Sequence, residues 1–186
     1  MARSLPAVRD TTAWYITLML RRSLVLLAIA SLAWLANASP AGAATSGPPV
    51  FLSLQRTCAN RAEMVPLAKR VAEADAVQDE QRFELHRELA REYYRCSKTH
   101  SQRDWRDYAT MAYIFEMLNS VDLDALDNLQ VARESRSRAQ LLEKQCNDLA
   151  ASARLPDIRS RARQGRDQLR KFEGVIDKII AQLEGG

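Results

Sequence analysis

Residues 158–183, IRSRARQGRDQLRKFEGVIDKIIAQL, decide the fold class of this 186-residue chain. Apolar or small residues recur along this stretch in steps of 4, 3, 4, 3, 4, 3 and 4, and they are Ile158, Ala162, Gly165, Leu169, Phe172, Ile176, Ile179 and Leu183. Heptad spacing of this kind places one narrow apolar seam along a helix, as in coiled coils. We expect a long C-terminal helix that packs by this seam against a second helix.

A similar seam lies just upstream of the first one. Its members step by three, four and again three and four residues, and they are Ala139, Leu142, Cys146, Leu149 and Ala153. Leu155 and Pro156 separate the two seams, and a proline rarely continues a helix. We therefore expect a coiled-coil-like antiparallel pair within one chain, although so regular a seam also permits self-association through the C-terminal helix.

The rest of the chain also favours helices, because it has few turn formers and is rich in Ala, Leu, Glu, Gln and Arg. We expect a first helical stretch over residues 50–77 that kinks or restarts at Pro66, a second over residues 79–97, and a third that ends near Asn119. The apolar faces expected for them are, in order, Phe51, Leu54, Cys58, Ala62, Val65, Ala68 and Ala72; then Phe83, His86, Leu89, Ala90 and Tyr93; then Trp105, Tyr108, Ala112 and Phe115.

Asp122 and Asp124 are expected to cap the next helix, because carboxylates satisfy free amide groups at a helix N-terminus. Their spacing, together with Arg133 at the position where a calcium loop needs a glutamate, does not match that motif. The fold class predicted from these patterns is all-α. It is an antiparallel helical bundle of about four to five helices over residues 50–184, with a coiled-coil-like C-terminal helix pair.

The N-terminal part has the features of an export signal. Arg21 and Arg22 precede an apolar run over residues 23–36, and small residues stand one apart at Ala36 and Ala38 and again at Ala41 and Ala43. This order is typical of a cleaved secretory signal. We expect a signal peptide over residues 1–43, with a true start at either Met1 or Met19, a flexible leader over residues 44–49, and a periplasmic or secreted mature protein. The alternative is an uncleaved anchor that holds an extracytoplasmic coiled coil at the membrane.

The net charge is smaller without the expected signal peptide. Residues 1–43 account for four of the 27 basic and one of the 23 acidic residues, which leaves 23 basic and 22 acidic. This balance gives no support to a nucleic-acid partner. A basic stretch remains in the last helix, where Arg159, Arg163, Arg166 and Arg170 are candidates for contact with an acidic partner or a membrane surface.

The three cysteines, Cys58, Cys96 and Cys146, all lie in the mature part. In an oxidising compartment two of them are expected to form a disulfide, which typically stabilises a fold by about 2–4 kcal/mol. Each lies on or beside the apolar face of a different helix, so three pairings are open. We favour Cys96 with Cys146, because Cys96 closes its helix and can approach a neighbour.

No catalytic, metal-binding or cofactor-binding motif is recognisable in the sequence. His86 and His100 are the only histidines, whereas zinc needs three or four nitrogen or sulfur ligands. We therefore expect no metal and no cofactor. The alternative is a cofactor- or metal-carrying helical bundle, or a small enzyme, that uses His86 or His100.

Aromatic residues are densest over residues 93–117. Tyr93 and Tyr94 are consecutive and cannot both point inward, and Tyr113 lies off the apolar face of its helix. Tyr94 and Tyr113 are therefore candidates for contact with a partner. We expect a non-catalytic protein–protein interaction or scaffold module of the cell envelope, whose partner is another envelope protein.

Overall fold

The structure is a computed structural model that describes residues 50–185, and within this range it contains helices and no strands. The elements are α2 (Val50–Thr57), α3 (Arg61–Ala76), α4 (Arg82–Thr99), α5 (Arg103–Asn119), the short 3-10 helix η1 (Asp124–Asp127), α6 (Leu129–Ser152) and α7 (Pro156–Glu184). The predicted all-α bundle is confirmed. The expected signal peptide and leader lie outside the described residues.

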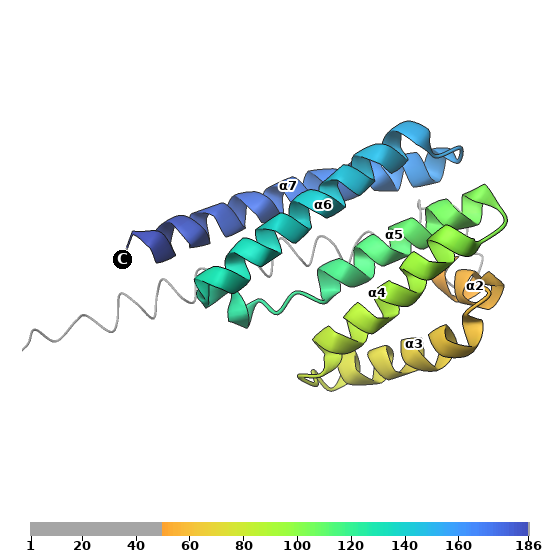
Figure 1. Cartoon of the computed structure of the whole chain (residues 1–186), viewed down its shortest axis with the longest axis horizontal. Coiled ribbons are helices and arrows are strands. Elements are labelled where there is room, and N and C mark those ends of the chain that lie inside the picture. Colours follow the sequence, from red (N-terminus) through yellow and green to blue (C-terminus); the bar gives the residue numbers. More distant parts are fainter. Residues whose placement is uncertain (1–49, 186) are drawn as a thin grey trace, which may run out of the picture.

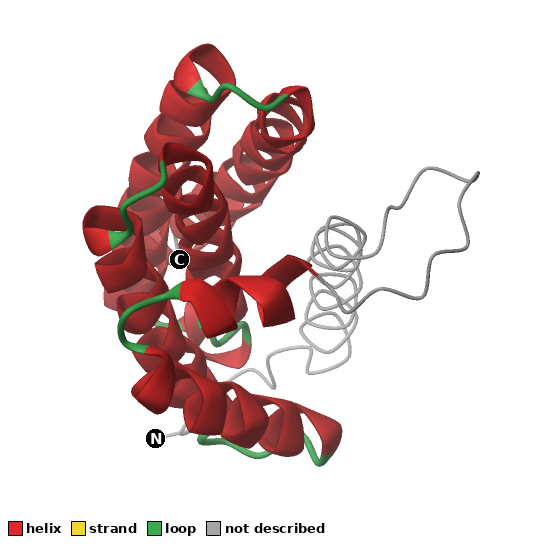
Figure 2. Ribbon diagram, turned by 90° about the vertical axis from the view of Figure 1, so that its right-hand side faces the viewer, coloured by secondary structure: helices red, strands yellow, loops and turns green. Residues whose placement is uncertain are grey.

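The helices run up and down beside one another (Figure 1). α3, α4 and α5 follow each other in alternating directions, and α6 and α7 form a long antiparallel pair along the other side of α5. Short loops join the successive helices from α3 to α5 and from α6 to α7 (Figure 2). Such links make consecutive helices antiparallel neighbours.

The helix α5 is shared between two apolar cores. The first core lies among α2, α3, α4 and α5, and α5 contributes Ala109 and Ala112 to it. The second lies among α5, α6 and α7, and α5 contributes Ile114 and Leu118. The single apolar face predicted for this helix was therefore incomplete, because a helix that is packed on two sides does not show one stripe.

The seam predicted for α7 is confirmed as its buried face. Every member from Ile158 to Ile179 is buried, and Leu183 at the end is partly buried against the same core. The α6 seam residues from Ala139 to Ala153 are buried opposite them. The seam of α7 is thus buried within the same chain, mainly against α6 and also against α5 and η1.

Ion pairs flank the α6–α7 contact on the surface. Arg136 and Asp177 lie 2.6 Å apart, as do Arg170 and Glu143, and the Arg133–Glu184 distance is 2.7 Å. Exposed pairs of this kind contribute about 0–1 kcal/mol each. Burial of the seam is therefore the larger source of stability for this pair.

The first predicted helix is broken earlier than expected. The chain leaves the helix at Cys58 and restarts at Arg61, five residues before Pro66, which stands inside α3. The restart changes the helical phase, so α3 buries Met64, Leu67, Val71 and Ala74, and the predicted face residue Val65 is exposed. Asn60 at the break donates to the backbone oxygen of Glu92, which fixes the turn against α4.

The predicted cap of the fourth helix was also wrong. Asp122 precedes η1 and Asp124 is its first residue, and the Asp122 side chain accepts a hydrogen bond from the backbone nitrogen of Asp124. The N-cap of α6 is Asn128, whose side-chain oxygen accepts from the backbone nitrogens of Gln130 and Val131. η1 occupies the residues between the two turns, and this shifts the helix start by several positions.

Candidate functional site

The disulfide joins Cys58 at the end of α2 to Cys96 near the end of α4, with Cα atoms 5.5 Å apart. The pairing favoured from the sequence, Cys96 with Cys146, is therefore wrong. Cys146 lies in the other core, on the far side of α5, where Gly165 of α7 faces it. The two cysteines of the bond both lie in the first core.

Cys146 is a buried free thiol. Burial raises its pKa to about 12, and Glu143 adds to this effect while Arg166 opposes it. The thiol is thus protonated at neutral pH, whereas the thiolate is the reactive form of cysteine. Cys146 fills space between α6 and α7.

Tyr94 on α4 and Tyr113 on α5 are brought together. Their ring centroids lie 5.4 Å apart with an interplanar angle of 54°, a tilted arrangement that aromatic pairs favour. The Nζ atom of Lys98 lies 4.9 Å from the centre of the Tyr94 ring. Tyr94 is 45% exposed, whereas the neighbouring Tyr93 is 1% exposed, so the two consecutive tyrosines point to opposite sides of α4.

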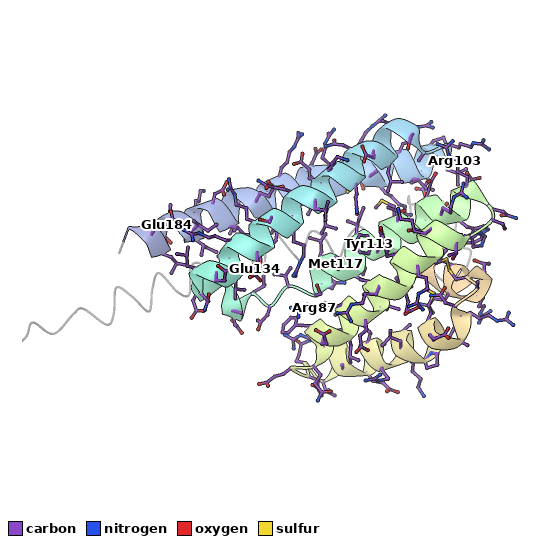
Figure 3. All side chains as sticks on the ribbon, in the orientation of Figure 1. Arg87, Arg103, Tyr113, Met117, Glu134 and Glu184 are labelled. Carbon is purple, nitrogen blue, oxygen red and sulfur yellow. A yellow bond between two sulfur atoms is a disulfide. The ribbon has the colours of Figure 1, made fainter. Side chains whose placement is uncertain are left out.

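A third helix adds an apolar side chain to this surface. Tyr113 hydrogen-bonds to Gln145 of α6, and Leu141 stands one turn before Gln145 on the same helix face. Leu141 is 53% exposed. We call Tyr94, Tyr113 and Leu141 the tyrosine face. Tyr113 and Met117 lie on the part of α5 that is visible between α4 and α6 (Figure 3).

The tyrosine face holds two of the four large apolar side chains that are exposed among the described residues. The four are Val65, Val77, Tyr94 and Leu141. Val65 lies on α3 and Val77 follows it, away from α6. Scattered single residues are ordinary on protein surfaces, whereas a cluster over three helices is typical of an interaction site.

The four arginines predicted as a basic binding surface are mostly engaged within the chain. Arg159 donates to the backbone oxygens of Ala153 and Arg154. Arg166 pairs with Asp167, and Arg170 pairs with Glu143. Arg163 is exposed. The basic stretch is therefore partly neutralised by its own surroundings.

The two histidines do not meet. His86 is 5% exposed within α4, and His100 follows the end of that helix, fourteen positions later or about 21 Å along the axis. The Nδ1 atom of His100 accepts from the backbone nitrogen of Gln102. Among residues 50–185 no group of three or more metal-binding side chains is placed to hold a metal ion.

His86 lies between two carboxylates that sequence reasoning missed. Its Nδ1 atom is 2.6 Å from Glu116 of α5, and its Nε2 atom is 3.1 Å from Asp75 of α3. Glu116 is buried with it. Glu116 occurs in a helix stretch that otherwise supplies apolar side chains to the cores, and this glutamate among buried positions is the only signal of the pair in the sequence.

Comparisons with known protein families, with curated proteins and with solved structures found no match for this chain. None of the helices among the described residues is both long enough and apolar enough to cross a membrane.

Proposed function

We propose that this protein is a non-catalytic interaction module of the cell envelope that binds another protein through the tyrosine face. The observations that carry the proposal are the exposed Tyr94 in ring contact with Tyr113, and the exposed Leu141 on α6, the helix that packs against α5. Tyrosine is enriched at protein interfaces because its rigid ring supplies contact area and its hydroxyl can donate or accept a hydrogen bond.

Placement in the envelope is supported by two independent features. The sequence carries the pattern of an export signal over residues 1–43, and Cys58 and Cys96 are paired in a disulfide. Disulfides persist in oxidising compartments and are rare in the reducing cytosol. The knobs-into-holes geometry of a coiled coil for α6 and α7, and an interface through the basic stretch of α7, remain further predictions.

The surroundings of His86 favour binding over catalysis. A general acid or base must reach its substrate, but His86 is buried and both of its ring nitrogens face carboxylates of the same chain. His100 is tied to the turn that precedes α5. Neither histidine is therefore offered to a substrate in this arrangement.

Site-specific photo-crosslinking in intact cells of the host tests the proposed interface. A photoreactive phenylalanine would replace Tyr94 or Leu141 in one set of strains, and Val65 or Val77 in the control set, because all four positions are exposed. We expect an adduct of the same mass from positions 94 and 141 and none from positions 65 and 77. Equal adducts at all four positions, or adducts from positions 65 and 77 alone, would contradict the tyrosine face as the interface.

Alkylation of cysteines before cell lysis tests the compartment separately. We expect Cys58 and Cys96 to be protected as a disulfide in freshly trapped protein, with Cys146 as the single free thiol after denaturation. Recovery of all three cysteines as alkylated thiols would argue against an oxidising location without bearing on the interface.

A further inference from the structure

The contacts of His86 join three helices at a single imidazole ring. His86 lies on α4, Glu116 on α5 and Asp75 on α3, with the nitrogen–oxygen distances of 2.6 and 3.1 Å given above. His86 and Glu116 are buried, whereas the side chain of Asp75 is 45% exposed. The cluster thus has a dry inner part and one member in contact with solvent.

Proton counting shows what this arrangement requires. A neutral imidazole has one N–H donor and one lone pair, and an ionised carboxylate has only acceptors. With a carboxylate at each ring nitrogen, one of the two contacts would bring two lone pairs together. Both contacts become hydrogen bonds when the cluster binds one further proton, either on the imidazole or on a carboxyl group.

We propose that Asp75, His86 and Glu116 form a buried proton-binding site that clamps α3 and α5 onto α4 while the proton is bound. The bound state has a net charge of −1, whereas the deprotonated state carries two carboxylates and a neutral ring. Loss of the proton leaves the buried Glu116 carboxylate without a positive partner, and an unpaired buried charge is strongly destabilising. The clamp therefore weakens as pH rises.

The ionisable groups around the cluster leave its charge uncompensated. Tyr93 is the other titratable group near Glu116, and its hydroxyl accepts a hydrogen bond from Gln55 of α2. Burial and then the charge of Glu116 raise the pKa of Tyr93, while Gln55 opposes the rise, so the phenol stays neutral. Arg87, the next residue of α4, pairs with Glu84 on the surface and approaches the backbone oxygen of Ser120.

The pKa shifts of His86 and Glu116 agree with the binding of one further proton by the cluster. Burial lowers the pKa of His86, but Glu116 and then Asp75 outweigh it, so the pKa lies above the ordinary 6.5. Burial raises the pKa of Glu116 above the ordinary 4.5, although His86 opposes this. In the unfolded chain both groups release their protons at lower pH. The folded state thus holds the extra proton above about pH 6.5, and its stability is lost as pH rises through the folded pKa.

The number of protons taken up on folding sets how steeply stability depends on pH. If folding takes up one proton, the folding equilibrium constant falls by about tenfold for each pH unit within the window. The window opens near pH 6.5, where the unfolded histidine loses its proton, and closes once the folded cluster has lost its own. Below that window the unfolded histidine is also protonated, so the slope is small.

Urea unfolding of the oxidised protein, measured between about pH 6.5 and 9, tests the proposal. We expect wild type to lose stability steeply over this window. Glu116→Gln removes the need for the extra proton, because the amide donates to Nδ1 while the Nε2 hydrogen donates to Asp75, and its slope should be nearly flat. His86→Gln should also flatten the slope, and His100→Gln should leave it unchanged. A purely structural role for the hydrogen bonds would lower stability equally at every pH.

NMR titration of the wild-type protein gives a second test that needs no variant of the cluster to fold. The chain has two histidines, so His100→Gln assigns both ring resonances. We expect the His86 ring to titrate above its ordinary range, and His100→Gln to leave that titration unchanged. A steep slope that persists in Glu116→Gln, or titration of the cluster at or below pH 6.5, would overturn the proton-binding site.

Discussion

Removal of the Cys58–Cys96 disulfide should cost about 4 kcal/mol of stability. The bond closes a loop whose ends are 38 residues apart. The chain-entropy relation for a loop of this length predicts about 4 kcal/mol at 25 °C, because the cross-link restricts the unfolded chain. Single domains have about 5–15 kcal/mol in total, so the reduced protein should be marginal.

The assay is urea unfolding followed by circular dichroism, on the wild type and on the double variant Cys58→Ala/Cys96→Ala. The midpoint should fall, and the m-value should rise because the unfolded chain without the bond exposes more surface. Both sulfurs are buried, so the alanines also remove some packing and the loss can exceed the loop term. Reduction of the wild type in the same assay separates the loop term from this packing loss.

Cys146→Ala is the matched control, because it removes a buried sulfur without opening a loop. Its loss should be smaller, of the order of 1 kcal/mol, and its m-value should match that of the wild type. If Cys146→Ala instead raised the m-value while Cys58→Ala left it unchanged, the bond would involve Cys146 and the argument from this structure would fail. A double variant as stable as the wild type would refute the loop argument itself.

Three further predictions concern packing and capping. Gly165→Ala should destabilise the wild type, because the added Cβ would lie 3.2 Å from the buried Sγ of Cys146. In the Cys146→Ala background the same substitution should stabilise the protein by up to about 1 kcal/mol. Thermal melts of the wild type, the two single variants and the double variant measure both effects. Tyr93→Phe should cost about 1–3 kcal/mol, because the side chain of Gln55 loses its buried acceptor. Tyr94→Phe should change the free energy of urea unfolding by less than about 0.5 kcal/mol. Equal losses would contradict the opposite orientations of the two tyrosine side chains. Asn128→Ala should cost about 1 kcal/mol through loss of the α6 cap, and Asn128→Asp should restore most of it in the same assay.

The α6–α7 pair was predictable because each helix buries one face. Ile158 through Leu183 follow a strict heptad, and α6 is the main partner of this seam. The helix α5 gave no such pattern, because Ala112 and Ile114 belong to different cores. A helix with two buried sides has no simple period in its apolar residues.

Long-range pairings were not recoverable from spacing along the chain. The choice among three cysteine pairings depends on which core each helix face enters, and α5 separates Cys146 from the other two. Similarly, His86 is 30 residues from Glu116 and 11 from Asp75 in sequence. Nothing local to these residues shows that they converge. The start of α6 was missed for a different reason: η1 and Asn128 offered a second capping site after Asp122.

The restart at Arg61 shows how one turn can change a predicted face. In the part of the first predicted helix that ends at Cys58, the apolar positions whose side chains are described are Leu54 and Cys58. Both are buried, as expected. Beyond the turn the phase differs, so Met64 replaces Val65 as the buried position. The cause is the contact of Asn60 with α4, which is a tertiary interaction and has no signature in the periodicity.

The helix α3 is held at its two ends by different kinds of contact. Near its start, the disulfide and the Asn60 contact attach the α2–α3 turn to α4. Near its end, Asp75 contacts His86, which lies ten residues before Cys96, or about 15 Å along α4. If the proton clamp opens at high pH, the covalent end remains. The expected response of the oxidised protein is therefore a local release of the α3 C-terminal end. Hydrogen exchange, corrected for the rise of the intrinsic exchange rate with pH, should show lower protection in the last turns of α3 and unchanged protection in α6 and α7.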